Sequence, residues 1–337
     1  MNKVHRYIYS NHSAQLTVLL GNGDGTFGMR INFTMDYLTH TSQMIAIDTD
    51  QDHILDIAII HTNENYITFI LGNGDGSFRE GTRVIVGRWS TPSAMAVGDF
   101  NGDMIVDIAF ICSGDTNIFI YLGDDSGSFS TKIMIDTEED TSPTMMTVAD
   151  FNGDGRSDIA ISSDSNGQRT IGVFIGYGNG SFENQKKSFS GGTTNVQYMI
   201  VGDFNGDRNQ DMTIAYRNLQ ILKVFLGHDD GTLSETARLM LESTPEAGHV
   251  VVKDFNKDGY SDIAMVIDAP YSVIIFSGNG NGQFQNYTIS FTNLYGESFS
   301  ISAGDFNNDN YQDIIITYSY SMSFDIFLNT GQCNSIH

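Results

Sequence analysis

The sequence has few basic residues, few prolines, two cysteines and one tryptophan. Its 17 Lys and Arg face 41 Asp and Glu, which gives a formal net charge of −24. Because nucleic acids are bound by basic surfaces that displace phosphate counterions, this balance argues against a nucleic-acid partner. No apolar run approaches the roughly 18 residues that mark a membrane-spanning helix, so we expect no membrane segment in this chain.

The scarce residue types exclude several further classes of protein. Cys112 and Cys333 form the only possible cysteine pair and show no spacing motif, so neither a disulfide nor a zinc site is predicted, and whether either thiol is free stays open. Cys112 lies in the apolar run FIC and is expected to be a small buried side chain. The single Trp excludes a WD40 array. No nucleophile elbow or HExxH motif is present, so we expect no enzyme.

The most informative feature is a nine-residue loop of the form D-x-[DN]-x-D-x-x-x-D, which occurs six times. Successive loops are 51, 51, 53, 51 and 51 residues apart. A repeat of this length is typical of propellers and arrays that bury one continuous core. The six loops begin at Asp48, Asp99, Asp150, Asp203, Asp254 and Asp305.

The loops also hold most of the excess negative charge. They contain 19 of the 41 acidic residues, and the other 22 nearly balance the 17 basic ones, leaving about −5. Carboxylates crowded in this way repel one another unless a hard cation lies between them. The pattern therefore predicts bound calcium, up to six ions, which would offset half of the net charge of −24.

Short apolar segments flank each loop. Before each loop, apolar residues stand four and two positions upstream of the first Asp. After each loop comes a run of the type Asp-Ile-Ala-Ile. Both patterns have the two-residue period of a β-strand. A third strand ends in a Gly-rich turn such as GNGDGSF, and a fourth strand leads to the next loop. Four antiparallel strands per repeat predict an all-β protein, a β-propeller.

The number of blades is open from the sequence. The chain begins in the middle of a repeat and ends after a third strand, so third strands number seven and loops number six. We favour seven blades with incomplete terminal blades; six blades and a stray hairpin are the alternative. One propeller domain is expected over residues 1–330, followed by a tail at 331–337.

The loop begins like an EF-hand, with oxygen ligands at positions 1, 3 and 5, but its position 12 is apolar in all six copies. DFNGDGRSD at 150, DFNKDGYSD at 254 and the LGNGDGSF turns resemble the FG-GAP/VCBS repeat family, which includes the propeller of integrin α subunits. In that family the side chains at positions 1, 3, 5 and 9 and the carbonyl at position 7 hold calcium. The resemblance implies the following ligands: Asp48, Asp50, Asp52 and Asp56; Asp99, Asn101, Asp103 and Asp107; Asp150, Asn152, Asp154, Asp158 and the carbonyl of Arg156; Asp203, Asn205, Asp207 and Asp211; Asp254, Asn256, Asp258 and Asp262; Asp305, Asn307, Asp309 and Asp313.

Family loops often have Gly at position 6, where the chain turns sharply. Gly155 and Gly259 keep it, so the third and fifth loops are expected to bind calcium best. The first, second and fourth loops carry His53, Met104 and Arg208 there and are expected to be weaker, because larger residues resist left-handed geometry.

The expected function is an extracellular, non-catalytic adhesion or recognition module that calcium makes rigid, with a protein or glycan as its partner. Four Asn-x-Ser/Thr sequons are compatible with secretion. A lectin or a polysaccharide-lyase-type propeller is the alternative. Aromatic residues and Arg dominate binding hot spots, and the variable loops opposite the calcium loops offer these candidate contacts: Tyr37, Tyr66, Arg88, Trp89, Tyr271, Tyr295, Tyr318 and Tyr320.

Overall fold

A computed structural model describes most of the chain. The described residues are 3–7, 14–35, 41–61, 64–87, 91–137, 142–165, 168–189, 196–216, 221–240, 249–268, 271–290, 298–318 and 323–331. All regular structure among them is β-strand, and none of them forms a helix capable of crossing a membrane.

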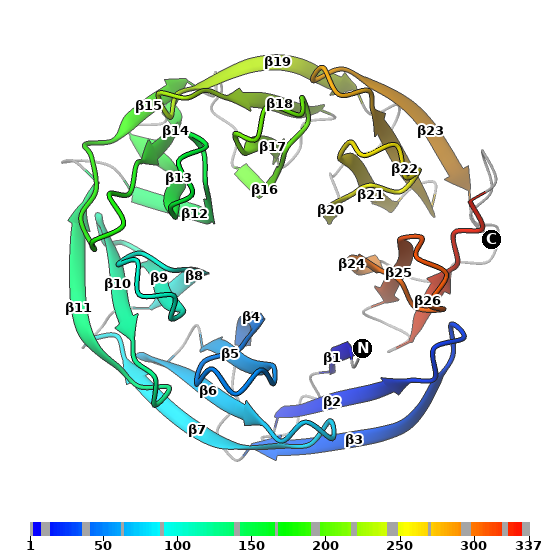
Figure 1. Ribbon diagram of the computed structural model, residues 1–337, viewed down its shortest axis with the longest axis horizontal. Coiled ribbons are helices and arrows are strands. Elements are labelled where there is room, and N and C mark those ends of the chain that lie inside the picture. Colours follow the sequence, from blue (N-terminus) through cyan, green and yellow to red (C-terminus); the bar gives the residue numbers. More distant parts are fainter. Residues whose placement is uncertain are drawn as a thin grey trace. The chain divides into compact units, whose positions relative to one another are not determined.

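The strands form antiparallel sheets whose members follow one another in the chain (Figure 1). The first sheet contains β1 (Lys3–Tyr7), β2 (Ala14–Gly21) and β3 (Phe27–Met35). The next three are β4 (Thr41–Ile47), β5 (Asp56–His61), β6 (Tyr66–Gly72) and β7 (Phe78–Ile85); β8 (Pro92–Gly98), β9 (Asp107–Cys112), β10 (Asn117–Gly123) and β11 (Phe129–Asp136); β12 (Ser142–Ala149), β13 (Asp158–Ser165), β14 (Gln168–Phe174) and β15 (Lys186–Phe189).

The remaining sheets continue the same order. They are β16 (Val196–Gly202), β17 (Asp211–Tyr216), β18 (Ile221–Gly227) and β19 (Leu233–Met240); β20 (Val250–Lys253), β21 (Asp262–Asp268), β22 (Tyr271–Gly278) and β23 (Phe284–Ser290); β24 (Ser298–Gly304), β25 (Asp313–Tyr318) and β26 (Phe324–Phe327). Each Asp-rich loop joins the first and second strands of its sheet, as the sequence predicts. The all-β propeller architecture is therefore confirmed.

The second strand of each repeat is the best buried. Every residue of β5, β9 and β17 is buried, because these strands have a neighbour on both edges and apolar packing on both faces. This explains why they read as continuous apolar runs after the loop Asp. Cys112, at the end of β9, lies in such a core, and burial raises the pKa of its thiol to about 12. Its predicted burial is confirmed.

The chain divides into two compact units. The first comprises residues 1–20, 27–150 and 154–192, and the second comprises residues 21–26, 151–153 and 193–337. Within each unit, apolar clusters join consecutive sheets. One cluster of the first unit contains Phe100 and Ile159, and one of the second contains Phe204 and Ile263, so the cores form where one sheet packs against the next.

The blade count depends on what defines a blade. Seven sheets are described, five with four strands and one with three at each end of the series. Six of them carry the Asp-rich loop, which gives the six-blade alternative. The favoured prediction of seven blades was therefore wrong, and the six-blade alternative holds: the sheet β1–β3 has three strands and no Asp-rich loop.

Loop position 2 links one sheet to the next. Phe occupies this position in five of the six loops, and these side chains are buried. Phe100 and Phe204 contact Phe182 and Phe284 of the following sheet at ring-centre distances of 5.9 and 5.4 Å. The position-2 carbonyl also accepts a hydrogen bond from a glycine of a third-to-fourth-strand turn. These bonds are Gly180 to Phe100 at 2.8 Å, Gly282 to Phe204 at 3.1 Å and Gly25 to Phe306 at 3.0 Å.

Candidate metal-binding loops

Two positions of each loop adopt left-handed backbone geometry. Position 6 has a positive φ in all six copies, as the sequence predicts, with values of 65° at Met104 and 81° at Gly155. Position 4 also has a positive φ in all six, which the sequence analysis missed: Gln51, Gly102, Gly153, Gly206, Lys257 and Asn308. The signal was present, because three of these six residues are glycine and one is asparagine.

This second position changes the order of loop strain. The third loop has Gly at both positions, whereas the first has Gln51 and His53, with φ values of 60° and 65°. The fifth loop pairs Lys257 with Gly259, so it carries one unfavourable residue rather than none. Strain alone therefore ranks the third loop first and the first loop last.

Met104 offers the clearest test of this strain, because its side chain is 86% exposed and has little packing to lose. We expect Met104→Gly to raise the free energy of unfolding by about 0.5 to 1 kcal/mol. Removing the left-handed strain stabilises the folded state, and the greater conformational freedom of glycine in the unfolded chain offsets part of that gain. Urea unfolding measures the change. Gly155→Met in the third loop is the matched opposite and should destabilise; an unchanged stability in both variants would contradict the strain argument.

Backbone amides fix the carboxylates at positions 1 and 5. In all six loops one oxygen of the position-1 Asp accepts the N–H of position 6, at 2.7 to 3.1 Å. One oxygen of the position-5 Asp accepts the N–H of position 7, at 2.7 to 3.0 Å. These bonds curl each loop around its acidic side chains and leave further lone pairs for another ligand.

The position-9 Asp is the last residue of the loop, and its carboxylate accepts backbone hydrogen bonds from other segments of the sheet. It is fully buried in all six copies. In the second loop, Asp107 accepts the N–H of Phe100 at 2.8 Å and the N–H of Gly123, at the end of the third strand, at 2.9 Å. The same pair of bonds occurs in the first, fourth, fifth and sixth loops, and in the third Gly176 donates to Asp158 at 2.8 Å. This carboxylate therefore ties three segments of the sheet together.

Burial perturbs these buried acids. It raises the pKa of Asp107 and of Asp262 to about 6, and that of Asp211 to about 7. The backbone N–H groups oppose the rise because they favour the charged form, and the nearby position-5 carboxylates add to it. Burial likewise raises the pKa of Asp313.

These shifts predict an unusual pH dependence for the metal-free protein. Because the folded-state pKa values lie above the unfolded value near 3.8, the folded state binds more protons between about pH 4 and pH 7. Their contribution to stability is present at low pH and is lost as the pH rises through 6 to 7. In EDTA, the unfolding free energy from urea titration should thus be higher at pH 5 than at pH 7.5. A rise in stability over that interval would contradict these shifts.

The first loop is the place where carboxylates gather most closely. Ligand oxygens of Asp48, Asp50 and Asp56 all lie within 4.8 Å of one another, the only such acidic group found among the described residues. One oxygen of Asp48 and one of Asp50 are buried and have no hydrogen-bond partner. Burial, followed by the charges of Asp56 and Asp52, raises the pKa of Asp50. Orphaned buried oxygens at converging carboxylates fit a hard cation.

The other loops relieve their repulsion in part by themselves, because position 3 is Asn. In the second, fourth, fifth and sixth loops its amide nitrogen donates to the position-5 carboxylate at 2.8 to 2.9 Å. Asp50 cannot donate in this way. In the fifth loop, one buried oxygen of Asp254 still has no partner. The sequence predicts weak calcium binding by the first loop, and two features of that loop point in opposite directions. Its backbone is the most strained of the six, but its carboxylate oxygens lie closest together.

Most of the predicted ligand-face residues lie outside the described residues: Tyr37, Arg88, Trp89, Tyr295 and Tyr320. Tyr271 begins β22, and its side chain is also outside the description. Tyr66 is half-buried at the end of its sheet away from the loop, with the His61 ring centre 4.9 Å away and the Arg83 guanidinium 5.4 Å above its ring. Tyr318 needs a correction: it is only 5% exposed and packs in a core cluster, because β25 is buried on both faces.

Comparisons with known proteins agree with the repeat. A family model described as FG-GAP-like repeat matches residues 48–110, 99–161, 150–214, 203–265 and 254–316. No curated protein sequence matches the chain.

Several solved structures share the fold at low sequence identity. An Agrocybe aegerita lectin, described as recognising non-reducing terminal N-acetylglucosamine, is 17% identical with a TM-score of 0.60, over 86% of this chain and 80% of the lectin. A functionally unknown protein from Desulfotomaculum acetoxidans is 14% identical with a TM-score of 0.61, over 93% and 88% of the two chains. A structure of BBS1N in complex with ARL6DN is 15% identical with a TM-score of 0.58, over 87% of this chain and 81% of that chain. At these identities the likeness is one of fold.

Proposed function

Because this chain belongs to the FG-GAP-like repeat family, we propose that it is a calcium-binding propeller that acts as a non-catalytic adhesion or ligand-recognition module outside the cell. The observation that carries the calcium part is the first loop, where three carboxylates converge and two buried oxygens have no partner. Millimolar calcium outside cells would fill such sites, which is the reason for the proposed extracellular location.

Each loop would hold calcium through the side chains at positions 1, 3, 5 and 9. When bound, the ion supplies positive charge that joins the two strands flanking the loop. This chain's own residues do the rest: the position-9 carboxylate binds the end of the third strand, and position-2 Phe packs against the next sheet. Calcium would therefore make the hairpins rigid.

A calorimetric titration of calcium into metal-free protein tests this role. Binding of several ions is expected, and Asp48→Asn combined with Asp52→Asn should remove the contribution of one site, because positions 1 and 5 are carboxylates in all six loops and the substitutions remove two negative charges that a cation needs. Asp75→Asn, on an exposed turn of the same sheet, is the control and should leave the stoichiometry unchanged. Absence of any calcium-dependent heat would refute calcium binding.

A lectin is the second candidate, and the fold shared with a lectin that recognises N-acetylglucosamine favours it over a lyase. A glycan array in the presence of calcium separates glycan recognition from protein recognition. Binding to one family of glycans would support the lectin, whereas cleavage of a polysaccharide would contradict a non-catalytic role.

A further inference from the structure

The first Asp-rich loop carries one more carboxylate than the other five, and its own sheet brings a cation to that carboxylate. Position 3 is Asp50 in this loop and Asn in all the others. On the fourth strand of the same sheet, β7, the guanidinium of Arg79 lies 3.5 Å from Oδ2 of Asp50. The additional acid is therefore accompanied by a basic residue from a different strand.

Two hydrogen bonds from the sheet hold this arginine beside the loop. Its Nη1 donates to the carbonyl of Gly72 at 2.8 Å and to Oδ1 of Asn73 at 3.2 Å, while its Nη2 faces Asp50. Gly72 ends the third strand, β6, so the anchors belong to the regular part of the sheet. The third loop also has an ion pair, Arg156 3.5 Å from Asp154, but no such anchor of Arg156 is found among the described residues.

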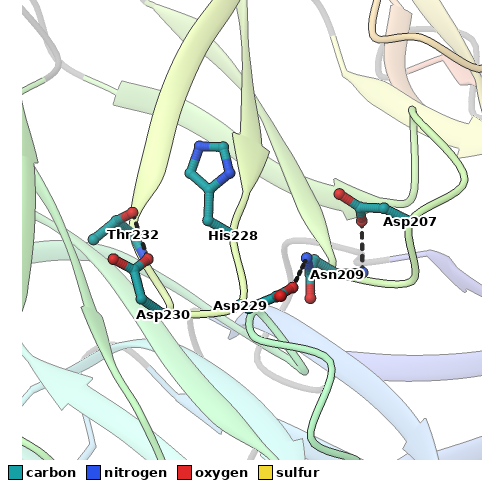
Figure 2. Close-up of a pocket in the computed structure, with 6 residues that line it drawn as sticks. All are labelled: Asp207, Asn209, His228, Asp229, Asp230 and Thr232. Carbon is teal, nitrogen blue, oxygen red and sulfur yellow. Dashed lines mark hydrogen bonds between the residues drawn. The ribbon is translucent and has the colours of Figure 1, made fainter.

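The position of Arg79 is the seventh after the glycine at the end of the third strand, and no other repeat with that glycine has a basic residue there. The residues at this position are Gly28, Ser130, Glu183, Ser234 and Gln285. The fourth loop shows the opposite arrangement: Asn209 of that loop donates to Asp229 of the facing turn at 3.0 Å, and Asp230 follows in the same turn (Figure 2). The fourth loop therefore meets further acids, whereas the first loop meets a cation.

The carboxylates of the first loop have one oxygen engaged by the protein and one left over. Oδ2 of Asp50 faces Arg79, and Oδ2 of Asp48 accepts the N–H of His53 at 2.9 Å. Oδ1 of each acid is buried and has no hydrogen-bond partner. A cation bound through the Oδ1 atoms would share the carboxylate of Asp50 with Arg79. The two positive charges would therefore repel each other at short range while they stabilise the same crowded acids.

From this geometry we propose that Arg79 is an internal counter-ion of the first loop, which stabilises the loop without calcium and lowers its affinity for calcium. The inference rests on the proposed calcium-binding function and concerns the regulation of one of its sites. Thermodynamic linkage gives the sign of the effect. Arg79 offsets carboxylate repulsion most when no other cation is present, so it stabilises the calcium-free loop more than the occupied one. The first loop should therefore need more calcium than it would without Arg79.

Hydrogen exchange followed by mass spectrometry, at increasing free calcium, tests the proposal on the whole chain. A peptide that spans residues 48–56 reports on the first loop separately from the other five, and its protection gives a calcium midpoint for that loop. Arg79→Gln removes the charge and keeps a hydrogen-bond donor. It should lower the midpoint by about three- to tenfold, and in EDTA it should speed exchange of the same peptide.

Two further variants show whether charge beside the loop is the cause. Arg79→Lys keeps the charge and should shift the midpoint much less. Arg83→Gln removes the same charge from the same strand, roughly 13 Å further along, beyond the screening length of about 8 Å in physiological salt, and should leave the midpoint unchanged. Because the side chain of Arg79 is 48% exposed, high salt should reduce the difference between wild type and Arg79→Gln.

The possible failures of the inference and of the proposed function are distinguishable. If Arg79→Gln leaves the midpoint of the first loop unchanged or raises it, while the loops still gain protection with calcium, the counter-ion role is refuted and the calcium function stands. A midpoint that Arg79→Gln and Arg83→Gln lower equally would show an effect of net charge and would also refute it. If no loop peptide responds to calcium, the calcium function fails and the inference fails with it.

Discussion

Removing calcium is expected to lower the melting temperature of the protein by roughly 10 °C or more. A loop whose Kd is one tenth of the ambient calcium concentration contributes ~1.4 kcal/mol by mass action, and six independent loops contribute ~8 kcal/mol. For a chain of 337 residues, this free energy corresponds to about 11 °C, given the usual unfolding entropy per residue. The effect is large because the same loop recurs in six sheets.

Calorimetric melting in calcium buffer, compared with melting in EDTA, measures this shift. Magnesium at the same concentration is the control, since its smaller, strictly octahedral shell suits flexible carboxylate loops less well and should restore only part of the stability. The first loop provides a matched variant: Asp48→Asn combined with Asp52→Asn should reduce the calcium-induced shift by about one sixth of its size. A melting temperature that EDTA does not change would show that the loops are stable turns without a metal.

Replacing a buried position-9 acid is expected to destabilise the protein strongly, even without calcium. Asp262 is fully buried and accepts the N–H groups of Phe255 and Gly278, each at 2.9 Å. Asp262→Ala leaves two buried donors unsatisfied, and hydrogen bonds to charged groups contribute about 1.5 to 3 kcal/mol each. We therefore expect a loss of about 3 to 5 kcal/mol in the free energy of unfolding.

Measuring this loss in EDTA at pH 8 separates the hydrogen bonds from the metal, at a pH where the raised pKa of Asp262, about 6, still leaves it ionised. The exposed Asp75 is the control, since it also accepts a backbone N–H, from Ser77 at 2.9 Å. Asp75→Ala should cost much less, because water replaces the lost acceptor. If Asp262→Ala destabilised the protein only in the presence of calcium, its main role would be metal binding and not the joining of strands.

The sequence determined the strand order, the recurrence of the loop and the burial of the strand after it. These features depend on short-range patterns: apolar residues at period 2, glycine at turns and Asp at fixed spacing, each set by local geometry. The recurrence of Phe at position 2 of five loops also indicates a shared packing role, which agrees with the burial of Phe100 and its equivalents. The left-handed geometry at loop position 4 was readable too, from three glycines and an asparagine, but was overlooked.

Tertiary structure alone decided the rest. Tyr318 is a residue type that is common in binding surfaces, but here it is buried because β25 is packed on both faces. The neighbouring residues in the sequence do not show this packing. The two partnerless oxygens of the first loop arise where Asp48, Asp50 and Asp56 converge in the folded chain. A sequence pattern fixes local conformation through neighbouring residues, whereas convergence and burial depend on distances between residues that only the folded chain brings together.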